Sequence, residues 1–450
     1  MRWKSLKKAP QYFLLIVSYG LYGQWNPAYC LILLYVTVIT YFGGRLLGFD
    51  LRRPRRLLIC TVAVLLALGP LLIFKYYNFI TEAGASALAN IGIDLAPPGL
   101  NWVVPLGLSF YTFQALGYLW DVYYNKIRSE KSFGDYMLFV AFFPQILCGP
   151  ISRASDLLPQ IKKPKDFEYS RAVAGLRLIL WGMFLKLVLA DRIGVYVDTV
   201  YKNYEFYSGS SCLLSSILYA FQIYGDFAGY SYMAVGVARM LGFDLIYNFK
   251  RPYFATSVSQ FWKRWNISLT NWLTSFVYIP LGGSRRGKVR TYMNIFITFL
   301  VSGIWHGANY TFILWGAIHG AAQCIEKSLG LNRENTIKWW RIPRILITFC
   351  IVAIAWIFFR MPTIGAAAEV IVKIFTNWGK LFIDSGTFIY IGLAFLILLP
   401  VEIFLEYRNA QFKHFLISHP LIRWSGYIFL TSIILLCGVL DSSQFIYINF

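Results

Sequence analysis

The chain has 450 residues, of which 58% are hydrophobic and 14% are charged, with 42 Lys and Arg against 21 Asp and Glu. Its apolar residues come in runs of about 20, the length of a membrane-spanning helix. No polar stretch is long enough to bury a core of its own, which excludes a hidden soluble domain. Nucleic-acid binding is disfavoured, because no soluble basic domain carries the net charge of +21. The seven cysteines are scattered, so we predict neither a disulfide framework nor a metal site.

The hydrophobic runs predict an all-α polytopic membrane protein, with residues 1–450 in a single integral membrane domain. We expect about ten to twelve transmembrane or re-entrant helices around a central polar tunnel, at ~20 apolar residues per span. In chain order the runs cover residues 12–44, 57–77, 101–124, 135–150, 172–200, 210–243, 291–326, 343–359, 386–406 and 421–440.

The first run follows a basic segment, MRWKSLKKAP, without the cleavage site of a signal peptide, and we expect a retained cytoplasmic end. Residues 12–44 are short of the ~40 that two full spans need. The triplet Trp25-Asn26-Pro27 offers a hinge, so two spans and a re-entrant hairpin both remain open. Basic loops at residues 52–56, 162–165 and 285–290 face the cytoplasm under the positive-inside rule.

Residues 257–273, SVSQFWKRWNISLTNWL, carry polar groups at regular spacing and predict one amphipathic helix. Ser257 and Gln260 have the form of a capping box at its start. Lys263 and Arg264 lie on one face, which favours a helix in the interface or dipping into the protein over a lipid-facing span. A plain surface-anchored helix is the alternative. The apolar stripe consists of Trp262, Trp265, Leu269, Trp272 and Phe276.

The next segment, YIPLGGSRRGKVR, predicts a flexible basic loop at the cytoplasmic surface. Arg285 and Arg286 could serve only as a topology signal. They could also attract a polyanionic ligand such as a CoA thioester to the mouth of a cavity.

One histidine lies deep in an apolar run, in VSGIWHGANY. The run from Tyr292 to Cys324 would be about 50 Å long as one helix, against a hydrocarbon core of ~30 Å. It must therefore break, and Gly303, Gly307 and Asn309 offer the place. An ionisable side chain at this depth, His306, is a functional candidate, and a neutral imidazole that joins two helices is the alternative.

The structural alternative is favoured for His319, which follows in LWGAIHGAA. His414 and His419 fall in a polar loop, and we expect no role for them.

Further polar groups inside apolar runs cluster in two places. The segment 219–243 combines them with small residues that let helices approach closely, and the segment 142–153 places them around a helix break. Both clusters predict a polar interior cavity, as an enzyme, a transporter or a channel would need. The candidates are Gln222, Tyr224, Asp226, Tyr230 and Ser231 in the first, and Pro144, Gln145, Gly149, Pro150 and Arg153 in the second.

At these residues the sequence resembles the membrane-bound O-acyltransferase family, within it the bacterial branch of the alginate O-acetyltransferase membrane subunit. The order and number of the matching segments carry the resemblance, which implies a family-like core at about residues 101–360. They are PLGLSFYTFQALGYLWDVY (105–123), FFPQILCGPISR, QIYGDFAGYSYMAVGVARMLGF, FWKRWNISLTNWL, YIPLGGSRRG, WHGANYTFILWGAIHG, WIFFR (356–360) and SQFIYINF (443–450).

The resemblance implies acyl transfer centred on the histidine of WHG and on a histidine or asparagine after RW, here His306 and Asn266. Relatives usually have RWH, so Asn266 lacks a second proton carrier and keeps an orienting role. Tyr232 stands where relatives tend to have an acid, so no carboxylate role is assigned there. The resemblance also implies that the chain begins within the relatives' second helix, so that an absent first span and a late start both remain open.

Acyl transfer from a thioester to an alcohol needs a base at the hydroxyl and a donor at the developing oxyanion. We predict His306 as the general base and Asn266 as the group that orients substrate or polarises the carbonyl. Trp305 and Trp265 line the tunnel, with ordinary packing as their alternative. Substrate-binding candidates are Lys263, Arg264, Gln145, Arg153, Gln222, Tyr224, Asp226, Ser231 and His319; Arg285 and Arg286 are predicted to contact the donor's phosphates.

By resemblance the donor is acetyl-CoA or a similar cytosolic acyl thioester, with no bound cofactor. The product is an O-acetyl ester on an exported polysaccharide or peptidoglycan, completed by a separate extracytoplasmic acetyltransferase partner. The protein is expected in the bacterial cytoplasmic (inner) membrane, in contact with lipid. Alternatives are D-alanyl transfer from a carrier protein to teichoic acid, a transporter of a lipid-linked sugar or acyl donor, and a scaffold.

Overall fold

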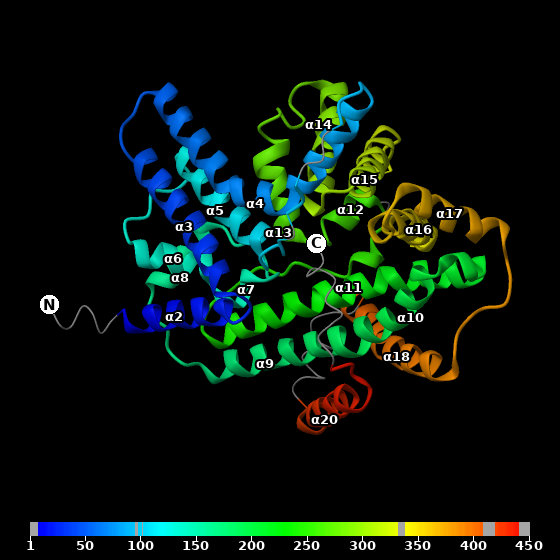
Figure 1. Ribbon diagram of the computed structural model, residues 1–450. Helices are drawn as coiled ribbons and strands as arrows, with labels where there is room; N and C mark the ends of the chain where they lie inside the picture. The colour runs from blue at the N-terminus through cyan, green and yellow to red at the C-terminus, as the bar shows by residue number, and fades with distance from the viewer. Residues whose placement is uncertain (1–7, 95–97, 101, 332–337, 408–418, 441–450) are drawn as a thin grey trace.

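The computed structural model describes residues 8–94, 98–100, 102–331, 338–407 and 419–440, and it contains helices and no strand over these residues. Figure 1 shows their arrangement. The α-helices are α2 (Ala9–Gly23), α3 (Pro27–Leu47), α4 (Arg53–Ala89), α5 (Leu108–Tyr123), α6 (Phe133–Ala141), α7 (Phe143–Ile146), α8 (Ala154–Lys162), α9 (Tyr169–Met183), α10 (Asp191–Lys202), α11 (Gly209–Met240), α12 (Val258–Trp262), α13 (Ile267–Leu273), α14 (Gly287–His306), α15 (Tyr310–Ser328), α16 (Arg341–Arg360), α17 (Ile364–Thr376), α18 (Ser385–Tyr407) and α20 (Pro420–Cys437).

The prediction of an all-α polytopic membrane protein is confirmed. Within the described residues, six helical segments are long and apolar enough to cross a membrane. Other predicted runs also form helices, but α2 and α5 are short, and α11, α14 and α15 fall outside that selection. The six are Pro27–Leu47, Arg53–Ala89, Tyr169–Lys202, Arg341–Arg360, Ser385–Tyr407 and Pro420–Cys437.

The predicted hinge in the first run is confirmed at Asn26. Its side chain accepts a hydrogen bond from the Ala28 N–H at 2.9 Å, and Pro27 occupies the first turn of α3. Asparagine at the cap and proline directly after it are preferred at helix starts. Helix α2 therefore ends before α3 begins, and only α3 is long enough to qualify as a span.

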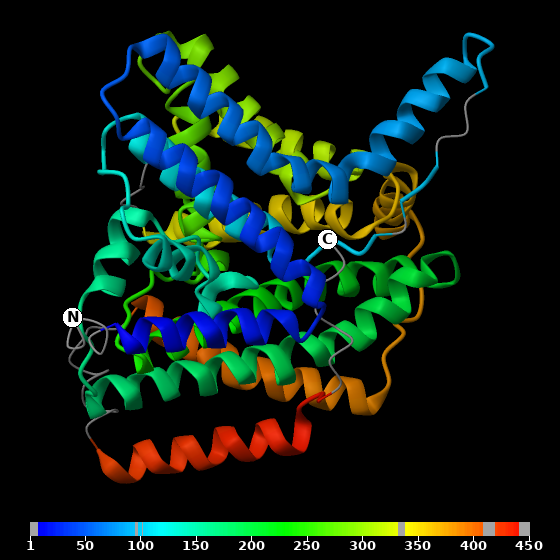
Figure 2. The same cartoon turned by 60° about the vertical axis from the view of Figure 1, so that its left-hand side comes forward.

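Helix α4 bends sharply near its middle, so that its second half projects from the body (Figure 2). Pro70 lies inside the helix and cannot donate a hydrogen bond to the carbonyl of Leu66. The hydroxyl of Tyr35 donates to that carbonyl instead, at 3.3 Å. The Leu66 carbonyl is therefore not left without a hydrogen-bond donor at the bend. This matters because lipid tails cannot donate a hydrogen bond.

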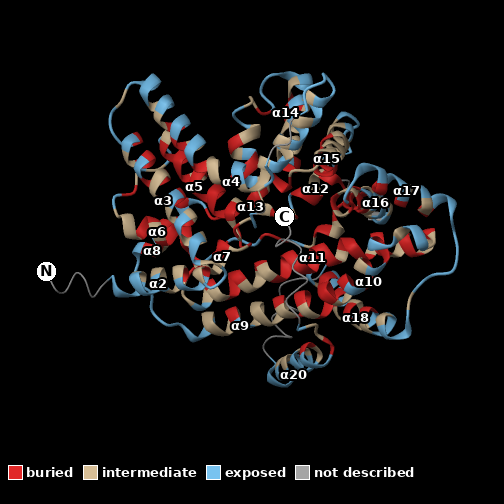
Figure 3. Cartoon of the chain, in the orientation of Figure 1, coloured by how far each residue is buried: buried red, intermediate tan, exposed pale blue. Residues whose placement is uncertain are grey.

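Helix α11 is the most buried long helix, and it packs along α9 (Figure 3). A Cβ on Gly182 would lie 2.5 Å from the Gly229 carbonyl oxygen, and a Cβ on Gly225 would lie 2.8 Å from the Leu185 carbonyl oxygen. The prediction that small residues let helices approach here is confirmed. By contrast, α20 is mostly exposed.

The prediction of one helix over residues 257–273 is wrong, since the segment forms α12 and α13 with a break between them. Asn266 takes the left-handed conformation at φ 41°, which a continuous helix does not allow. Backbone bonds from outside hold the break open, since the Lys250 N–H donates to the Arg264 carbonyl at 2.9 Å and the Ile267 N–H to the Asn248 carbonyl at 3.0 Å.

The start of this segment is as predicted, because the Ser257 hydroxyl accepts from the Gln260 N–H at 3.0 Å. The Gln260 side chain, however, accepts from the Thr256 N–H and not from Ser257. The predicted apolar stripe is buried along its whole length.

The run around His306 breaks as predicted, with α14 ending at His306 and α15 beginning at Tyr310. Gly307 is extended, and Asn309 caps α15 by accepting from the Thr311 N–H at 3.0 Å. Gly303 is not part of the break. It lies inside α14, where its hydrogen faces the Phe312 carbonyl oxygen and Gly316 of α15.

We expect Gly303→Ala to destabilise the protein by about 1–3 kcal/mol, because overpacking forces backbone shifts. The added Cβ would lie 2.3 Å from the Phe312 carbonyl oxygen, so α14 and α15 must separate. Gly426→Ala in α20 is the matched control, since a Cβ added at this glycine would meet nothing within 4 Å. The apparent melting temperature in detergent measures both variants, and an equal melting temperature for the two would contradict the prediction.

Candidate active site

His306 lies at the C-terminal end of α14 and is 5% exposed. Aromatic rings surround its imidazole, with ring centroids of Trp305, Trp315 and Phe359 at 4.7, 4.9 and 5.0 Å. We find no hydrogen bond between the imidazole and any other described residue. The ring is therefore held by packing, and its nitrogens are not committed to joining two helices.

A pocket of about 130 Å³, the His306 pocket, adjoins the imidazole. It is lined mostly by apolar groups and the backbone before α5, with no carboxylate among its lining residues. The lining consists of Trp25, Lys75, Val104, Pro105, Leu106, Gly107, Leu108, Ser109, Phe110, Leu147, Tyr230, Trp305 and His306. Of the predicted tunnel residues, it therefore brings together Trp305 and His306.

The sequence analysis missed Lys75, which lies in the second half of α4 and lines the His306 pocket. Its ammonium donates to the Trp305 carbonyl at 2.7 Å, and the adjacent Tyr76 hydroxyl donates to the Ile304 carbonyl. The last carbonyls of a helix lack partners within it, so both residues satisfy the end of α14. A lysine inside an apolar run was the available signal.

A larger pocket of about 340 Å³, the Lys263 pocket, is lined in part by α14, from Ile295 to Ser302. Its lining contains two lysines, several hydroxyls and no carboxylate. Ser302 is one of its lining residues. It lies one turn before His306, and residues four apart share a helix face. The lining consists of Ser259, Trp262, Lys263, Leu269, Thr270, Leu273, Thr274, Tyr278, Ile295, Thr298, Phe299, Ser302, Gln323 and Lys327.

Asn266 does not line either of these pockets. It is 1% exposed, and its side-chain oxygen has no hydrogen-bond partner. The neighbouring Trp265 belongs to an aromatic cluster that reaches the imidazole, through Trp356 at 5.1 Å, Trp315 at 5.7 Å from Trp356, and His306 at 4.9 Å from Trp315. The orienting role of Asn266 stays a prediction.

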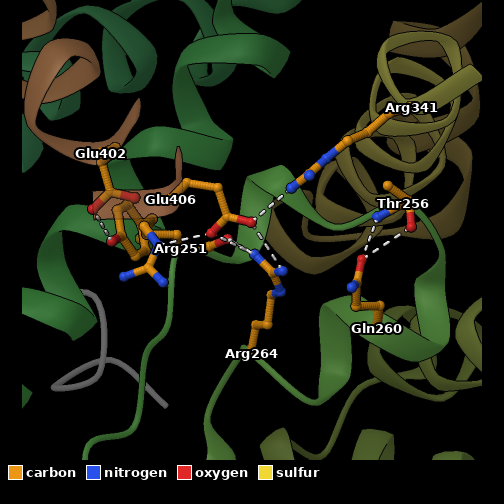
Figure 4. Close-up of polar contacts among 8 residues, drawn as sticks. Arg251, Thr256, Gln260, Arg264, Arg341, Glu402 and Glu406 are labelled. Carbon is orange, nitrogen blue, oxygen red and sulfur yellow. Dashed lines mark hydrogen bonds and ion pairs between the residues drawn. The ribbon is translucent and has the colours of Figure 1, made fainter. Parts of the chain in front are cut away.

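Arg264 makes a bidentate ion pair with Glu406, at 3.0 and 3.1 Å. Arg251 and Arg341 reach the same carboxylate at 2.8 and 3.0 Å, so that three arginines converge on one acid (Figure 4). The guanidinium fork of Arg264 is therefore committed within the protein. Lys263, one residue earlier, is exposed and remains available to a ligand.

Arg153 lies in a third pocket of about 120 Å³, where Asp121, Asp156 and Asp244 also line the wall. A wall with three carboxylates and one arginine does not favour the binding of an anionic ligand there. Arg153 donates instead to the hydroxyl of Ser275.

Gln145 joins a buried chain of hydrogen bonds, donating to Gln114 at 2.8 Å and accepting from Ser152 at 2.7 Å. Gln222 and Ser231 are buried on α11, and the Gln222 side-chain oxygen lacks a partner. None of these three lines the His306 pocket or the Lys263 pocket.

Asp226 forms part of a buried ion triad. The ammonium of Lys186 lies 2.7 Å from Asp226 and 2.6 Å from Asp191, and all three side chains are less than a tenth exposed. Lys186 belongs to a π-helical segment, η1 (Phe184–Ala190), which joins α9 to α10. Its ammonium also lies 5.6 Å from the ring centroid of Tyr230, a wall of the His306 pocket.

Tyr224 donates to Glu402 of α18 at 2.9 Å, and both are buried. His319 accepts at Nδ1 from the Trp262 indole at 3.3 Å, while its Nε2 is buried without a partner. This bond joins α12 to α15, which agrees with the structural alternative for His319.

Arg285 and Arg286 are exposed in the loop before α14, and neither lines the Lys263 pocket. His414 and the terminal motif SQFIYINF lie outside the described residues. His419 is exposed and precedes α20.

An all-helical membrane body with a buried histidine at the end of a broken helix, on the wall of an acid-free pocket, fits an intramembrane transferase. Residues 122–363, more than half of the chain, match MBOAT, the membrane-bound O-acyltransferase family. The chain belongs to this family.

Its relatives place it more narrowly. The chain is 36% identical over 365 residues to the "Probable alginate O-acetylase AlgI" of Pseudomonas syringae pv. tomato, covering 79% of this chain and 68% of the relative. It is 32% identical over 391 residues to a peptidoglycan O-acetyltransferase of Helicobacter pylori, covering 80% and 73%. A teichoic acid D-alanyltransferase of Streptococcus thermophilus is 28% identical over 56% of this chain and 68% of the relative. The chain is therefore an O-acetyltransferase of the alginate O-acetylase branch.

Proposed function

We propose that the protein moves an acetyl group from a cytosolic thioester, acetyl-CoA or a similar donor, through the cytoplasmic membrane to an exported polysaccharide or peptidoglycan. The observation that carries this proposal is the position of His306, which lines one acid-free pocket while Ser302, one turn earlier, lines another. A relay across a membrane needs access from two sides to one reactive group. Two of the relatives are named for alginate and for peptidoglycan, which supports a polymeric acceptor.

The donor enters by the Lys263 pocket. Lys263 and Lys327 supply positive charge at its wall, and the exposed basic loop that contains Arg285 and Arg286 precedes α14, the helix that also lines the pocket. Phosphates are attracted by such fields without fixed pairing. Arg264 is not part of this assignment, because its fork is occupied by Glu406.

His306 acts as the general base. Its unbonded imidazole faces a pocket that can admit a hydroxyl, and it takes the hydroxyl proton as the acceptor oxygen attacks the thioester carbonyl. The imidazole then returns the proton to the departing thiolate sulfur. Ring packing on three sides fixes its direction, which keeps the base in the attacking geometry.

An extracytoplasmic acetyltransferase partner completes the transfer to the polymer. The D-alanyl alternative uses the same histidine and differs in the donor and in the acid that is esterified. The smaller share of this chain that matches the D-alanyltransferase, 56% against 79% for the alginate O-acetylase, favours acetyl transfer.

The experiment compares the acid released by mild alkali from the extracellular polymers of three isogenic strains. They are the parent, a deletion of the gene, and the deletion complemented with His306→Ala at parental protein level. We expect acetate to disappear in both mutants. Loss of D-alanine would move the protein to the other branch, and parental ester content in the His306→Ala strain would make the histidine structural.

The donor assignment predicts that Lys263→Met combined with Lys327→Met raises the KM for acetyl-CoA about tenfold or more, since two charge contacts of roughly 1 kcal/mol each are lost. Label transfer from acetyl-CoA into polymer, measured in membrane vesicles, gives the KM. The pair Arg153→Met and Arg177→Met is the control, because neither residue lines this pocket. An unchanged KM in the lysine pair would contradict the assignment.

A further inference from the structure

We infer that the ammonium group of Lys75 stabilises the negative charge that develops on the acyl carbonyl oxygen during transfer at His306. This inference rests on the proposed function and adds a second catalytic residue to it. Lys75 comes from α4, outside the segment that matches the family.

The first support is the composition of the His306 pocket. Lys75 is the one lysine or arginine among its lining residues, and no carboxylate lines the pocket. No ion pair joins Lys75 to a carboxylate anywhere in the described part of the chain. A protonated Lys75 therefore has no described carboxylate to offset its charge on the wall that it shares with the imidazole, where an anionic transition state would form.

The second support is the number of hydrogen bonds that the Lys75 ammonium group donates. An ammonium group has three donors, and the structure shows one of them used, on the Trp305 carbonyl at 2.7 Å. The indole of Trp305 flanks the same ammonium, with 5.8 Å between Nζ and the ring centroid. Two N–H groups have no partner among the described residues and are available to a carbonyl oxygen in the pocket.

The third support is that capping alone does not require a charge. Tyr76, the next residue, caps the Ile304 carbonyl with a neutral hydroxyl. A lysine inside a membrane helix costs several kcal/mol when nothing uses its charge. A neutral donor would satisfy Trp305 as well as Ile304, so the charge at position 75 points to a ligand.

The acceptor oxygen forms a bond to the thioester carbonyl carbon, its proton passes to His306, and the carbonyl π electrons move onto the oxygen that the Lys75 N–H groups face. When the tetrahedral intermediate collapses, the C–S bond breaks and the thiolate takes the proton from His306. Preorganised donors at such an oxygen are worth about 10²–10³ in rate.

The test compares Lys75→Met, Lys75→Arg and Tyr76→Phe in the deletion strain. Methionine keeps much of the length of the side chain without the charge, and arginine keeps the charge. Tyr76→Phe is the matched control, because it removes a cap from the neighbouring carbonyl and does not line the pocket. Each strain is scored for alkali-released acetate, for the melting temperature of the purified protein in detergent, and for kcat and KM with acetyl-CoA in membrane vesicles.

We expect Lys75→Met to lower kcat about 100-fold with little change in KM, Lys75→Arg to recover part of kcat, and Tyr76→Phe to keep most of it. Lys75→Met with more than half of the parental kcat would overturn the inference. Equal losses of activity and melting temperature in Lys75→Met and Tyr76→Phe would also overturn it, since both would then act as caps. If the gene deletion itself leaves acetate unchanged, the proposed function fails; if only Lys75→Met leaves acetate unchanged, the inference alone fails.

Discussion

Replacement of His306 by glutamine lowers acetyl transfer by about 10²–10⁴-fold while the protein stays folded, because general base catalysis contributes rates of this order. Glutamine keeps a hydrogen-bonding side chain of similar length but cannot accept a proton at neutral pH. The imidazole makes no hydrogen bond to another described residue, so its replacement leaves no polar partner orphaned. Alkali-released acetate and the melting temperature in detergent measure the two effects separately.

The matched control is His319→Gln. His319 accepts from Trp262 and lies outside both pockets, so this variant is expected to lower the melting temperature more than the activity. A transporter would keep much of its function with His306→Gln, and a scaffold would tolerate it fully. Retention of acetate in the His306→Gln strain would therefore reject the role of this histidine as a base.

Replacement of Lys186 by methionine is the substitution expected to destabilise the fold most. It leaves the carboxylates of Asp191 and Asp226 buried beside each other without a cation. Removing one partner of a buried ion pair costs about 3–5 kcal/mol, and here two acids lose the same partner. We expect a lower yield of folded protein and a clearly lower melting temperature.

Lys202→Met on α10 is the control, because the Lys202 side chain is 70% exposed and its ion pair with Asp198 is 3.9 Å long. Adding Asp191→Asn and Asp226→Asn to Lys186→Met should restore much of the lost stability, since no buried charge then remains. A triple variant as unstable as Lys186→Met would show that packing, and not charge, holds this region.

The sequence predicts helices and their breaks well where one residue decides the outcome. Asn26 and Pro27 start a helix, and the stretch from Gly307 to Asn309 ends one and starts the next. The prediction of one helix over residues 257–273 was wrong. The spacing of its apolar residues continues through the break, which depends on backbone hydrogen bonds with Asn248 and Lys250, outside this segment.

The candidate site was predictable where chemistry and depth coincide, as at His306. The residues that these side chains contact in the folded protein were not predictable. The role of Arg264 depends on Glu406, which is far away in sequence, and that of Lys75 depends on the Trp305 carbonyl, which belongs to another helix. The spacing of residues along the sequence shows which of them share one face of a helix. It does not show contacts between separate helices, and these contacts are of that kind.

The contacts of Glu406 limit which segments of this enzyme can be transferred to another protein. It is contributed by α18, beyond the residues that match the family, yet it neutralises Arg264, which stands two residues before Asn266, and it also holds Arg251 and Arg341. A chimera that takes only residues 122–363 from this chain would carry three clustered guanidinium groups without their acid. The family segment is thus not an interchangeable module, and its graft must bring the carboxylate of α18 along.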